Sequence, residues 1–283
     1  MRTELTIVAD SGATKAAWMV SGHGGTVSFR TDGINVSHSS EALMRKVLSE
    51  AFKTVSDRFG GCAGRMWFYS AGVPGERCRS LFAEVFPDME IHICSDLDGA
   101  SHALLGNEDG IACILGTGCN SGLYRSGTLV RNIHPCGFIL GDEGSAAALG
   151  RRFVADYLKG LVPEEVTGVV ARGRNMDYAE VVSQVYNGPA PARYLGSFAP
   201  GIMSLYGVDP YVTAIAEENI KEFFRLYVLR YEGARSLPVC FAGSFALACK
   251  DLIAKAADLA GINVAKVSAD ITGPLAAYHI NRR

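Results

Sequence analysis

The chain has 283 residues, a formal net charge of −2, 48% hydrophobic residues and 20% charged residues. This balance is typical of a globular protein and excludes a mainly disordered chain. The basic residues are scattered along the chain, so we expect neither nucleic acid nor a membrane as a partner. The length suffices for one large domain or two moderate ones.

The N-terminus and the cysteines indicate the cellular compartment in which we expect the protein. Residues 1–4 lack the charged and then apolar layout of a secretory signal, and the apolar run 5–9 is too short to span a bilayer. The eight cysteines include no C-x-x-C pair, and several lie in apolar runs, where a thiol behaves as a small hydrophobe. We therefore expect buried free thiols and a cytoplasmic protein.

The N-terminal half predicts a mixed sheet covered by helices. Apolar runs at 5–9, 16–20 and 26–30 are separated by polar turns and predict a meander of three strands. Apolar residues at helical spacing predict a helix over 43–55. Strands at 66–69 and 91–94 follow, with a short helix between them.

From Gly110 the same order begins again. Strands are predicted at 111–115, 121–124 and 128–131, and the stretch 146–234 is largely helical, with its longest helix starting at Asp209-Pro210. A strand at 237–241, a helix at 246–259 and a last helix from about Pro274 complete the chain. Two similar orders of elements suggest two related lobes, although the identity between the halves is too weak for a sequence repeat.

Two turns carry the chemistry, and each follows an apolar strand. Their sequences are Asp10-Ser11-Gly12-Ala13-Thr14-Lys15 and Gly116-Thr117-Gly118-Cys119-Asn120. Small residues let successive backbone amides approach an anion, and a carboxylate at a strand end can hold Mg²⁺ beside phosphates. One such turn is more often an ordinary turn, whereas two that open similar lobes favour a phosphate site.

Other nucleotide-binding signatures fit poorly. The chain has no glycine loop followed by Lys and then Ser or Thr, as the Walker pattern requires. Gly116, Gly118 and Gly122 are spaced one residue too far for the dinucleotide fingerprint, and a strand rather than a helix follows them.

Six short elements together resemble a known family. They are residues 10–14 (DSGAT), 33–35 (GIN), 95–96 (SD), 116–120 (GTGCN), 141–145 (GDEGS) and 242–244 (AGS). In this order they resemble the N-acetylglucosamine kinase branch of the BadF/BadG/BcrA/BcrD ATPase family, within the actin, sugar kinase and Hsp70 superfamily. The resemblance spans nearly the whole chain.

The resemblance implies an α/β, two-lobed, ribonuclease H-like actin/hexokinase/Hsp70 fold with an inter-lobe cleft. The N-terminal lobe would cover residues 1–105 and the C-terminal lobe, with a helical insertion, residues 106–283. The final helix, about 273–283, could pack back on the N-terminal lobe. A homodimer formed through the helical lobe is a further expectation from the resemblance.

The resemblance also implies roles for single residues, with ATP and Mg²⁺ as cofactors and a small sugar as the substrate. Asp10 would orient the Mg²⁺ ion. The nucleotide phosphates would bind to Thr14, Gly116, Thr117 and Gly118, and the adenosine part to Gly243 and Ser244. The sugar would bind to Asn35, Asp96, Cys119, Asn120 and Asp142, with Asp96 as the catalytic base.

Asp96 has support from its position alone. It ends an apolar strand and begins a helix, so it can project into a cleft near the positive end of the helix. A simple helix cap explains this position equally well, and Asp98 is a rival for the role of base. Because an aspartate with a pKa of about 3.9 is a weak base, most of the acceleration would come from positioning and charge neutralisation.

Asp142 and Glu143 also allow a second interpretation, as acidic residues in the first turn of the following helix. The neighbouring glycines favour close approach to a sugar instead.

The related kinases tend to have a glycine and a tryptophan where this chain has Pro135-Cys136-Gly137-Phe138. The identity of the sugar therefore stays open among N-acetylglucosamine, glucosamine and N-acetylmuramic acid.

The sequence thus favours a sugar kinase that acts on N-acetylglucosamine or a related amino sugar. One alternative is an ATPase that activates a partner enzyme, as in the branch of the superfamily whose cysteines hold an iron–sulfur cluster; the scattered cysteines argue against it. A sugar or nucleotide sensor without turnover is a second alternative. An actin-like filament protein is a more remote one.

Overall fold

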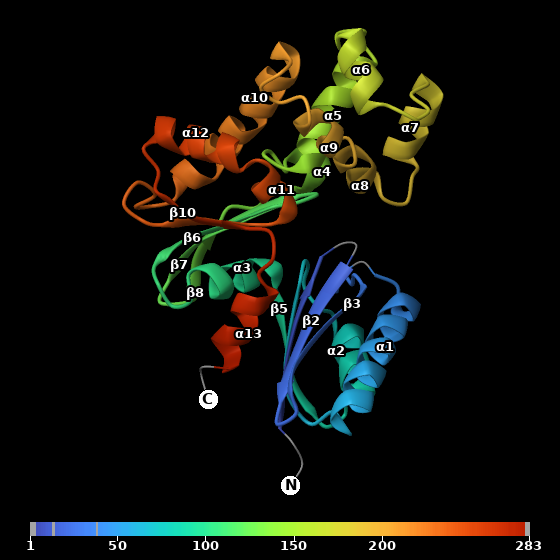
Figure 1. The fold of residues 1–283 in the computed structure, drawn as a ribbon, viewed down its shortest axis with the longest axis vertical. Helices are drawn as coiled ribbons and strands as arrows, with labels where there is room; N and C mark the ends of the chain where they lie inside the picture. Colours follow the sequence, from blue (N-terminus) through green and yellow to red (C-terminus); the bar gives the residue numbers. More distant parts are fainter. Residues whose placement is uncertain (1–3, 13–14, 38, 281–283) are drawn as a thin grey trace. The chain divides into compact units, whose positions relative to one another are not determined.

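The computed structural model describes residues 4–12, 15–37 and 39–280, which form two compact units (Figure 1). The first unit comprises the chain up to Gly106 together with the residues from Asp270 onward. The second unit is Asn107–Ala269. Within the described ranges each unit contains one five-stranded sheet.

The first sheet has the strand order β3-β2-β1-β4-β5. The first three strands pair antiparallel as a meander, while β4 is parallel to both β1 and β5. The strands are β1 (Leu5–Ser11), β2 (Lys15–Gly22), β3 (Gly25–Asp32), β4 (Gly64–Ser70) and β5 (Met89–Ser95). All five predicted strands of this half are confirmed.

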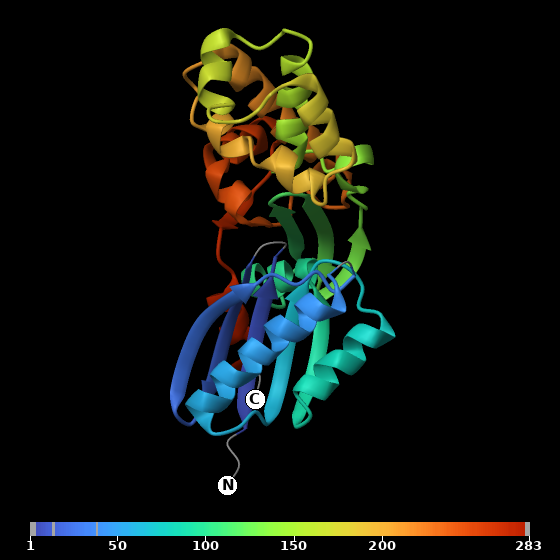
Figure 2. The same cartoon turned by 90° about the vertical axis from the view of Figure 1, so that its right-hand side faces the viewer.

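Helices cover both faces of the first sheet. α1 and α2 lie on one face, as Figure 2 shows for α1, and α3 and α13 pack on the other. Their bounds are α1 (Glu41–Phe59), α2 (Glu76–Val85), α3 (Asp96–Leu104) and α13 (Thr272–Ile280). α1 begins where the Ser40 side chain accepts a hydrogen bond from the Leu43 N–H, and it ends at Gly60 in a left-handed conformation.

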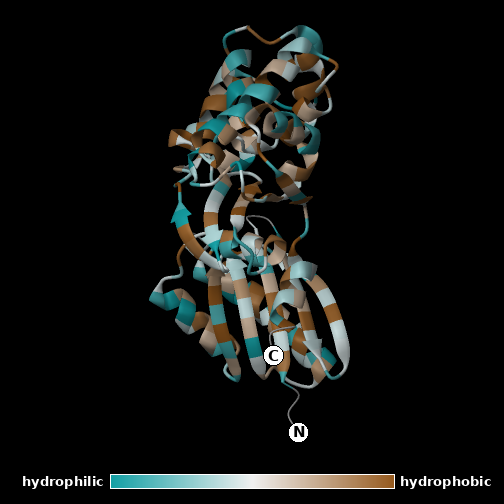
Figure 3. Ribbon diagram, turned by 90° about the vertical axis from the view of Figure 1, so that its left-hand side faces the viewer, coloured by the Kyte–Doolittle hydropathy of each residue, from teal (hydrophilic) through white to brown (hydrophobic). Residues whose placement is uncertain are grey.

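The hydrophobic core of the first unit follows from alternation along the strands. Hydrophobic and hydrophilic residues alternate along the sheet, as Figure 3 shows. Trp18 is fully buried, stacks on Phe29 with ring centroids 5.8 Å apart, and donates its indole N–H to the Thr31 hydroxyl at 2.9 Å. The polar end of the largest core side chain is therefore satisfied.

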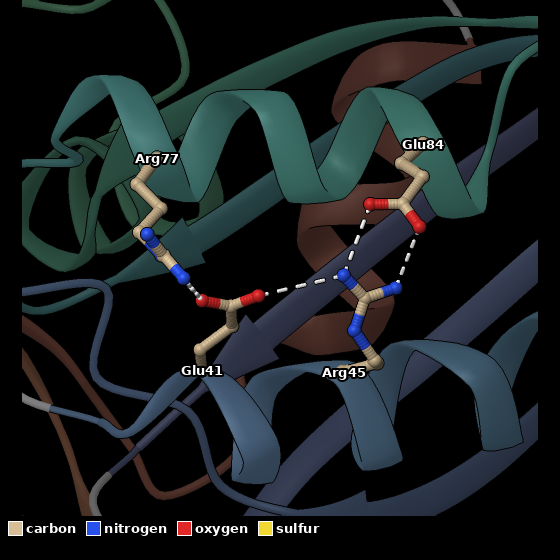
Figure 4. A network of polar contacts seen from close by, with 4 residues as sticks. All are labelled: Glu41, Arg45, Arg77 and Glu84. Carbon is tan, nitrogen blue, oxygen red and sulfur yellow. Dashed lines mark hydrogen bonds and ion pairs between the residues drawn. The ribbon is translucent and has the colours of Figure 1, made fainter.

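The outer surfaces of α1 and α2 are joined by ion pairs (Figure 4). Arg45 contacts Glu84 at 2.7 Å and Glu41 at 3.5 Å, and Arg77 also pairs with Glu41. These side chains are largely exposed to water, which screens their charges, so the pairs contribute little to stability.

The second sheet repeats the plan of the first, with the order β10-β9-β6-β7-β8. β6, β7 and β8 form an antiparallel meander, and β9 is parallel to both β6 and β10. The strands are β6 (Gly110–Leu115), β7 (Cys119–Arg125), β8 (Thr128–Asn132), β9 (Val239–Ala242) and β10 (Val264–Ser268). The predicted α/β class and the repeated order of elements are confirmed.

The second unit is rich in helices. They are α4 (Gly137–Leu140), α5 (Ala146–Tyr157), α6 (Glu164–Val170), α7 (Tyr178–Tyr186), α8 (Pro191–Gly196), α9 (Ala199–Met203), α10 (Pro210–Leu226), the 3₁₀ turn Val228–Arg230, α11 (Ser244–Ala248) and α12 (Lys250–Ala260). α10 starts as predicted, because the Asp209 carboxylate accepts the Val212 N–H and Pro210 takes the first helical position. Among the residues that the structure describes, no helix combines the length and the apolar character needed to cross a bilayer.

One prediction near the C-terminus is wrong, and one strand there was not predicted. The helix expected over 246–259 is two helices, because Cys249 leaves helical geometry between α11 and α12. Strand β10 was not predicted, since its five residues are only partly buried or exposed and show no strict alternation. Pairing with β9, which the local sequence does not reveal, makes this segment a strand.

Gly150 allows a test of the packing in the second unit. A β-carbon at this position would overlap the Leu195 carbonyl oxygen, so Gly150→Ala should destabilise the protein by about 1–3 kcal/mol in spite of alanine's better helix propensity. Gly168, which also lies in a helix but has nothing near its missing side chain, is the control. Gly168→Ala should stabilise by about 0.5–1 kcal/mol. Urea unfolding of both variants measures the difference, and a stabilising Gly150→Ala would contradict the close helix contact.

Candidate functional site

Predicted site residues of the first unit gather at the carboxyl ends of its parallel strands. Asp10 is the last residue but one of β1, and Ser95 ends β5 directly before Asp96. In parallel α/β sheets this edge is where ligands usually bind. Asp10 of β1 pairs with Tyr69 of β4, and Ser70 of β4 pairs with Ser95 of β5. The carboxyl ends of these three strands are therefore aligned.

Negative charge accumulates at this edge. The pKa of Asp10 is raised to about 6, mainly by burial and to a smaller extent by the carboxylates of Asp96 and Asp270. The pKa of Asp96 is also raised, mainly by burial, although its hydrogen bond from the Leu97 N–H at 2.8 Å opposes the shift. The fold therefore holds the carboxylates of Asp96 and Asp270 close enough to act on Asp10.

The two candidate bases have different surroundings. Ser95 is the N-cap of α3: its hydroxyl accepts the Asp98 N–H at 3.0 Å and donates to the Asp98 carboxylate at 2.8 Å. Asp98 thus belongs to the cap of the helix, and the interpretation of Asp96 as that cap is wrong. The assignment of Asp96 as the base stays a prediction.

Two serines fix the loop that carries Asn35. The Ser11 hydroxyl donates to the Ile34 carbonyl at 2.9 Å and accepts the Ile34 N–H at 2.8 Å, and the Ser70 hydroxyl donates to the same carbonyl at 2.7 Å. These bonds tie the loop to the ends of β1 and β4. The Asn35 side-chain oxygen accepts the Ser37 N–H at 2.9 Å. Sequence reasoning missed both serines, whose only signal is their place at the ends of buried strands.

The donor set at this edge suits a magnesium ion held mainly through water. No group of three or more His, Cys, Asp or Glu side chains within the described ranges could by itself hold a metal ion. Asp10 offers one oxygen-bearing group at a strand end, and a nearby cation would relieve the repulsion from Asp96 and Asp270. Thr14, the predicted phosphate ligand of the same segment, lies outside the described residues. The Gly12 N–H donates to the Lys15 carbonyl at 3.0 Å.

In the second unit, the Gly116–Asn120 hairpin sits on the first turn of α5. The Gly116 N–H bonds the Gly118 carbonyl at 2.9 Å and closes the turn. The Gly116 and Thr117 carbonyls accept the N–H groups of Ala146 and Ala147, each at 3.0 Å. The Asn120 side-chain oxygen accepts from Ser121 N–H and from the Asn132 side chain, each at 2.9 Å.

Asp142 is held in an unusual conformation beside this hairpin. Its φ of 59° lies in the left-handed region, which non-glycine residues rarely adopt. Its buried carboxylate accepts the Cys119 N–H at 3.3 Å, and burial raises its pKa while this hydrogen bond opposes the shift. A β-carbon at residue 118 would lie only 3.1 Å from the carboxylate, so a larger residue there would require the Asp142 side chain to shift.

The second interpretation of Asp142 and Glu143 is wrong. α5 is capped by Ser145, whose hydroxyl accepts the Ala148 N–H at 3.1 Å, and the first turn of α5 contains no acidic residue. Asp142 and Glu143 therefore precede the helix, in the turn that brings Asp142 to the hairpin.

Gly243 and Ser244 lie next to the hairpin. Gly243 follows β9 with a φ of 117°, and a β-carbon there would overlap the Leu115 carbonyl oxygen, one residue before Gly116. Ser244 begins α11. The predicted phosphate segment, the Asp142 turn and the predicted adenosine segment are thus neighbours within the second unit.

Sequence reasoning missed the roles of two polar residues in this unit. The Tyr227 hydroxyl donates to the Glu143 carboxylate at 2.7 Å, and the Asn219 side chain donates to the Ser145 carbonyl at 3.1 Å. The sequence held one indication of these contacts. Asn219 and Tyr227 lie four residues before and after Phe223, along a face of α10 that is otherwise apolar.

No family model matches the sequence, and no curated protein matches it significantly. Among solved structures, the chain resembles a provisionally assigned N-acetylglucosamine kinase of Porphyromonas gingivalis, with a TM-score of 0.87 and 31% sequence identity. The match covers 98% of this chain and 99% of the other.

Two more distant structures show the fold. A provisionally assigned N-acetylglucosamine kinase of Chromobacterium violaceum matches with a TM-score of 0.75 and 18% identity, over 98% of this chain and 99% of the other. A ROK-family glucokinase of Streptomyces griseus, solved with glucose and AMPPNP, matches with a TM-score of 0.60 and 17% identity, over 97% of each chain. The predicted two-lobed, actin-like sugar-kinase fold is confirmed.

The raised pKa of Asp10 predicts a pH-dependent cost to stability. Because its pKa rises from 3.8 to about 6 on folding, the ionised group destabilises the folded protein as the pH rises through 6. Asp10→Asn should match the wild type at pH 4 and exceed its stability by up to about 3 kcal/mol at pH 8 without added metal. Urea unfolding at both pH values measures this. Asp57→Asn, at an exposed carboxylate of α1, is the control. A gain that is equal at both pH values would contradict the prediction.

Proposed function

The chain belongs to the same family as the provisionally assigned N-acetylglucosamine kinase of Porphyromonas gingivalis, and from that premise we propose that it transfers the γ-phosphate of ATP to a hydroxyl of N-acetylglucosamine or a related amino sugar. The observation that carries the proposal is Asp142. A buried carboxylate in a left-handed turn, set against a glycine hairpin, is a costly arrangement that a polar ligand would explain.

The nucleotide is assigned to the segments that meet at the ends of β6 and β9. The amides of Thr117 and Gly118 would bind phosphate oxygens, with Gly116 allowing close approach. Gly243 and Ser244 would receive the adenosine part. Thr14 completes the predicted phosphate ligands.

Asp10 would hold Mg²⁺ beside the phosphates, and Asp96 would act as the base. When bound, the metal neutralises charge on the phosphates as the γ-phosphate is transferred. Asn35, Cys119, Asn120 and Asp142 would position the sugar. Because burial raises the pKa of Asp96, this carboxylate is a better base near neutral pH than an exposed aspartate.

The direct test is ADP release in a coupled assay with N-acetylglucosamine, glucosamine, N-acetylmuramic acid and glucose. We expect the highest kcat/KM with an amino sugar, loss of turnover with EDTA and recovery with excess Mg²⁺. An absence of sugar-dependent ADP release with all three amino sugars would refute the proposal.

Asp96 and Asp98 can be separated by substitution. Asp96→Asn should lower kcat by about 10²–10⁴-fold, because general-base catalysis typically contributes that much. Asp98→Asn weakens the Ser95 cap instead, so it should lower stability by about 1 kcal/mol and change kcat less than tenfold. Steady-state kinetics and thermal unfolding measure both effects. If Asp98→Asn lost more activity than Asp96→Asn, the base would be Asp98.

A further inference from the structure

One face of α10 and its C-cap carries three residues that all contact the turn containing Asp142. Asn219, Phe223 and Tyr227 are spaced four residues apart, and this spacing places them along one side of a helix. All three are distant in sequence from the turn 141–145. None of them belongs to the predicted set of ligand-binding residues.

Asn219 binds the turn through both polar atoms of its side-chain amide. Its oxygen accepts the Gly144 N–H at 3.1 Å, and its nitrogen donates to the Ser145 carbonyl at 3.1 Å. The two bonds fix the backbone on the C-terminal side of Asp142 and Glu143. Few side chains other than an amide could make both contacts, because one partner is a donor and the other an acceptor.

Phe223 closes the space between the two polar residues. Gly144 has a φ of 85°, and a β-carbon there would overlap the Phe223 side chain, so the turn lies directly against the helix. Phe223 is fully buried, with its ring centroid 5.2 Å from that of Tyr227 and 6.0 Å from that of Phe241 on β9. The helix face is thereby anchored to the sheet.

Tyr227 binds the side chain of Glu143, the residue that follows Asp142. Its hydroxyl donates to the Glu143 carboxylate at 2.7 Å and lies close to the Cys119 thiol. Burial and the bond to Glu143 raise the pKa of Tyr227, so the hydroxyl stays protonated and remains a donor. Tyr227 therefore touches both the turn and the first residue of β7, whose N–H binds Asp142.

These contacts matter because Asp142 does not favour its own backbone conformation. A left-handed aspartate persists only when its surroundings hold it. The local bonds from Asp142 N–H to the Pro135 carbonyl and from Ser145 N–H to the Asp142 carbonyl close the turn. They do not anchor it to another element, whereas the Cys119 N–H bond to the Asp142 carboxylate and the contacts of Asn219 and Tyr227 do.

We propose that Asn219 and Tyr227 are positioning residues that set the affinity for the sugar by holding the Asp142 carboxylate in place, without touching the substrate. This inference rests on the proposed function, in which Asp142 binds sugar hydroxyls. A loss of either contact should weaken sugar binding and leave nucleotide binding unchanged.

The variants Tyr227→Phe and Asn219→Ala test it, with Tyr231→Phe as a matched control. Tyr231 is as deeply buried as Tyr227, and its hydroxyl bonds Ser121 at 2.8 Å and the Ile133 N–H at 3.1 Å, away from the turn. We expect Tyr227→Phe and Asn219→Ala to raise the KM for the sugar about tenfold or more, and to change the KM for ATP less than twofold. A tenfold change corresponds to about 1.4 kcal/mol.

A merely structural role would give a different pattern. Tyr231→Phe should lower the melting temperature as Tyr227→Phe does and leave the KM for the sugar unchanged. Asn219→Asp keeps the acceptor for the Gly144 N–H, so it should recover part of the affinity lost in Asn219→Ala. Equal sugar KM values in the wild type, Tyr227→Phe and Asn219→Ala would overturn the proposal.

Hydrogen exchange provides a readout that does not depend on activity. Amides of residues 141–147 should exchange faster in Tyr227→Phe than in Tyr231→Phe. If the wild type phosphorylates no sugar, the proposed function fails, and the exchange rates still decide whether Tyr227 holds the turn. Unchanged exchange in Tyr227→Phe would refute the positioning role on its own.

Discussion

Close approach of backbone segments at glycines shapes the second unit. Gly243 lies against the Leu115 carbonyl, Gly118 against the Asp142 carboxylate and Gly144 against Phe223. A side chain at residue 243 would overlap backbone, whereas one at residue 118 or 144 would press on the side chain of Asp142 or Phe223. Because these glycines add no side chains of their own, backbone amides and a carboxylate can be gathered in a small space. The predicted phosphate, adenosine and sugar residues of this unit owe their proximity to these contacts.

The first unit faces a different constraint, which is electrostatic. Its sheet buries Asp10, which is the main cost to the charge of this residue, at an edge where Asp96 and Asp270 also repel it. Such a cluster lowers the stability of the folded protein at neutral pH. A cation at Asp10 would remove much of that cost.

Support from elements far along the chain connects fold and chemistry in both units. Ser11 and Ser70 hold the loop of Asn35 from the ends of two strands, while Asn219 and Tyr227 hold the Asp142 turn from one helix. The supporting groups are small hydroxyls or single amides whose bonds go to backbone atoms or to one neighbouring carboxylate. A residue predicted to bind ligand, such as Asp142, can therefore keep a strained backbone conformation because side chains from other parts of the chain hold it there.

The sequence by itself determined the repeated order of strands, the start of α10 at Asp209-Pro210 and the two glycine-bearing turns, because these features depend on alternation, capping and turn chemistry within a few residues. Only the tertiary structure decided that Ser95 rather than Asp96 caps α3, that Asp142 precedes α5, that residues 264–268 form a strand, and that Asn219 and Tyr227 contact the turn. Each of these outcomes depends on hydrogen-bond geometry or on a partner that the local sequence does not reveal. For Asn219 and Tyr227 that partner lies more than 70 residues away in the sequence.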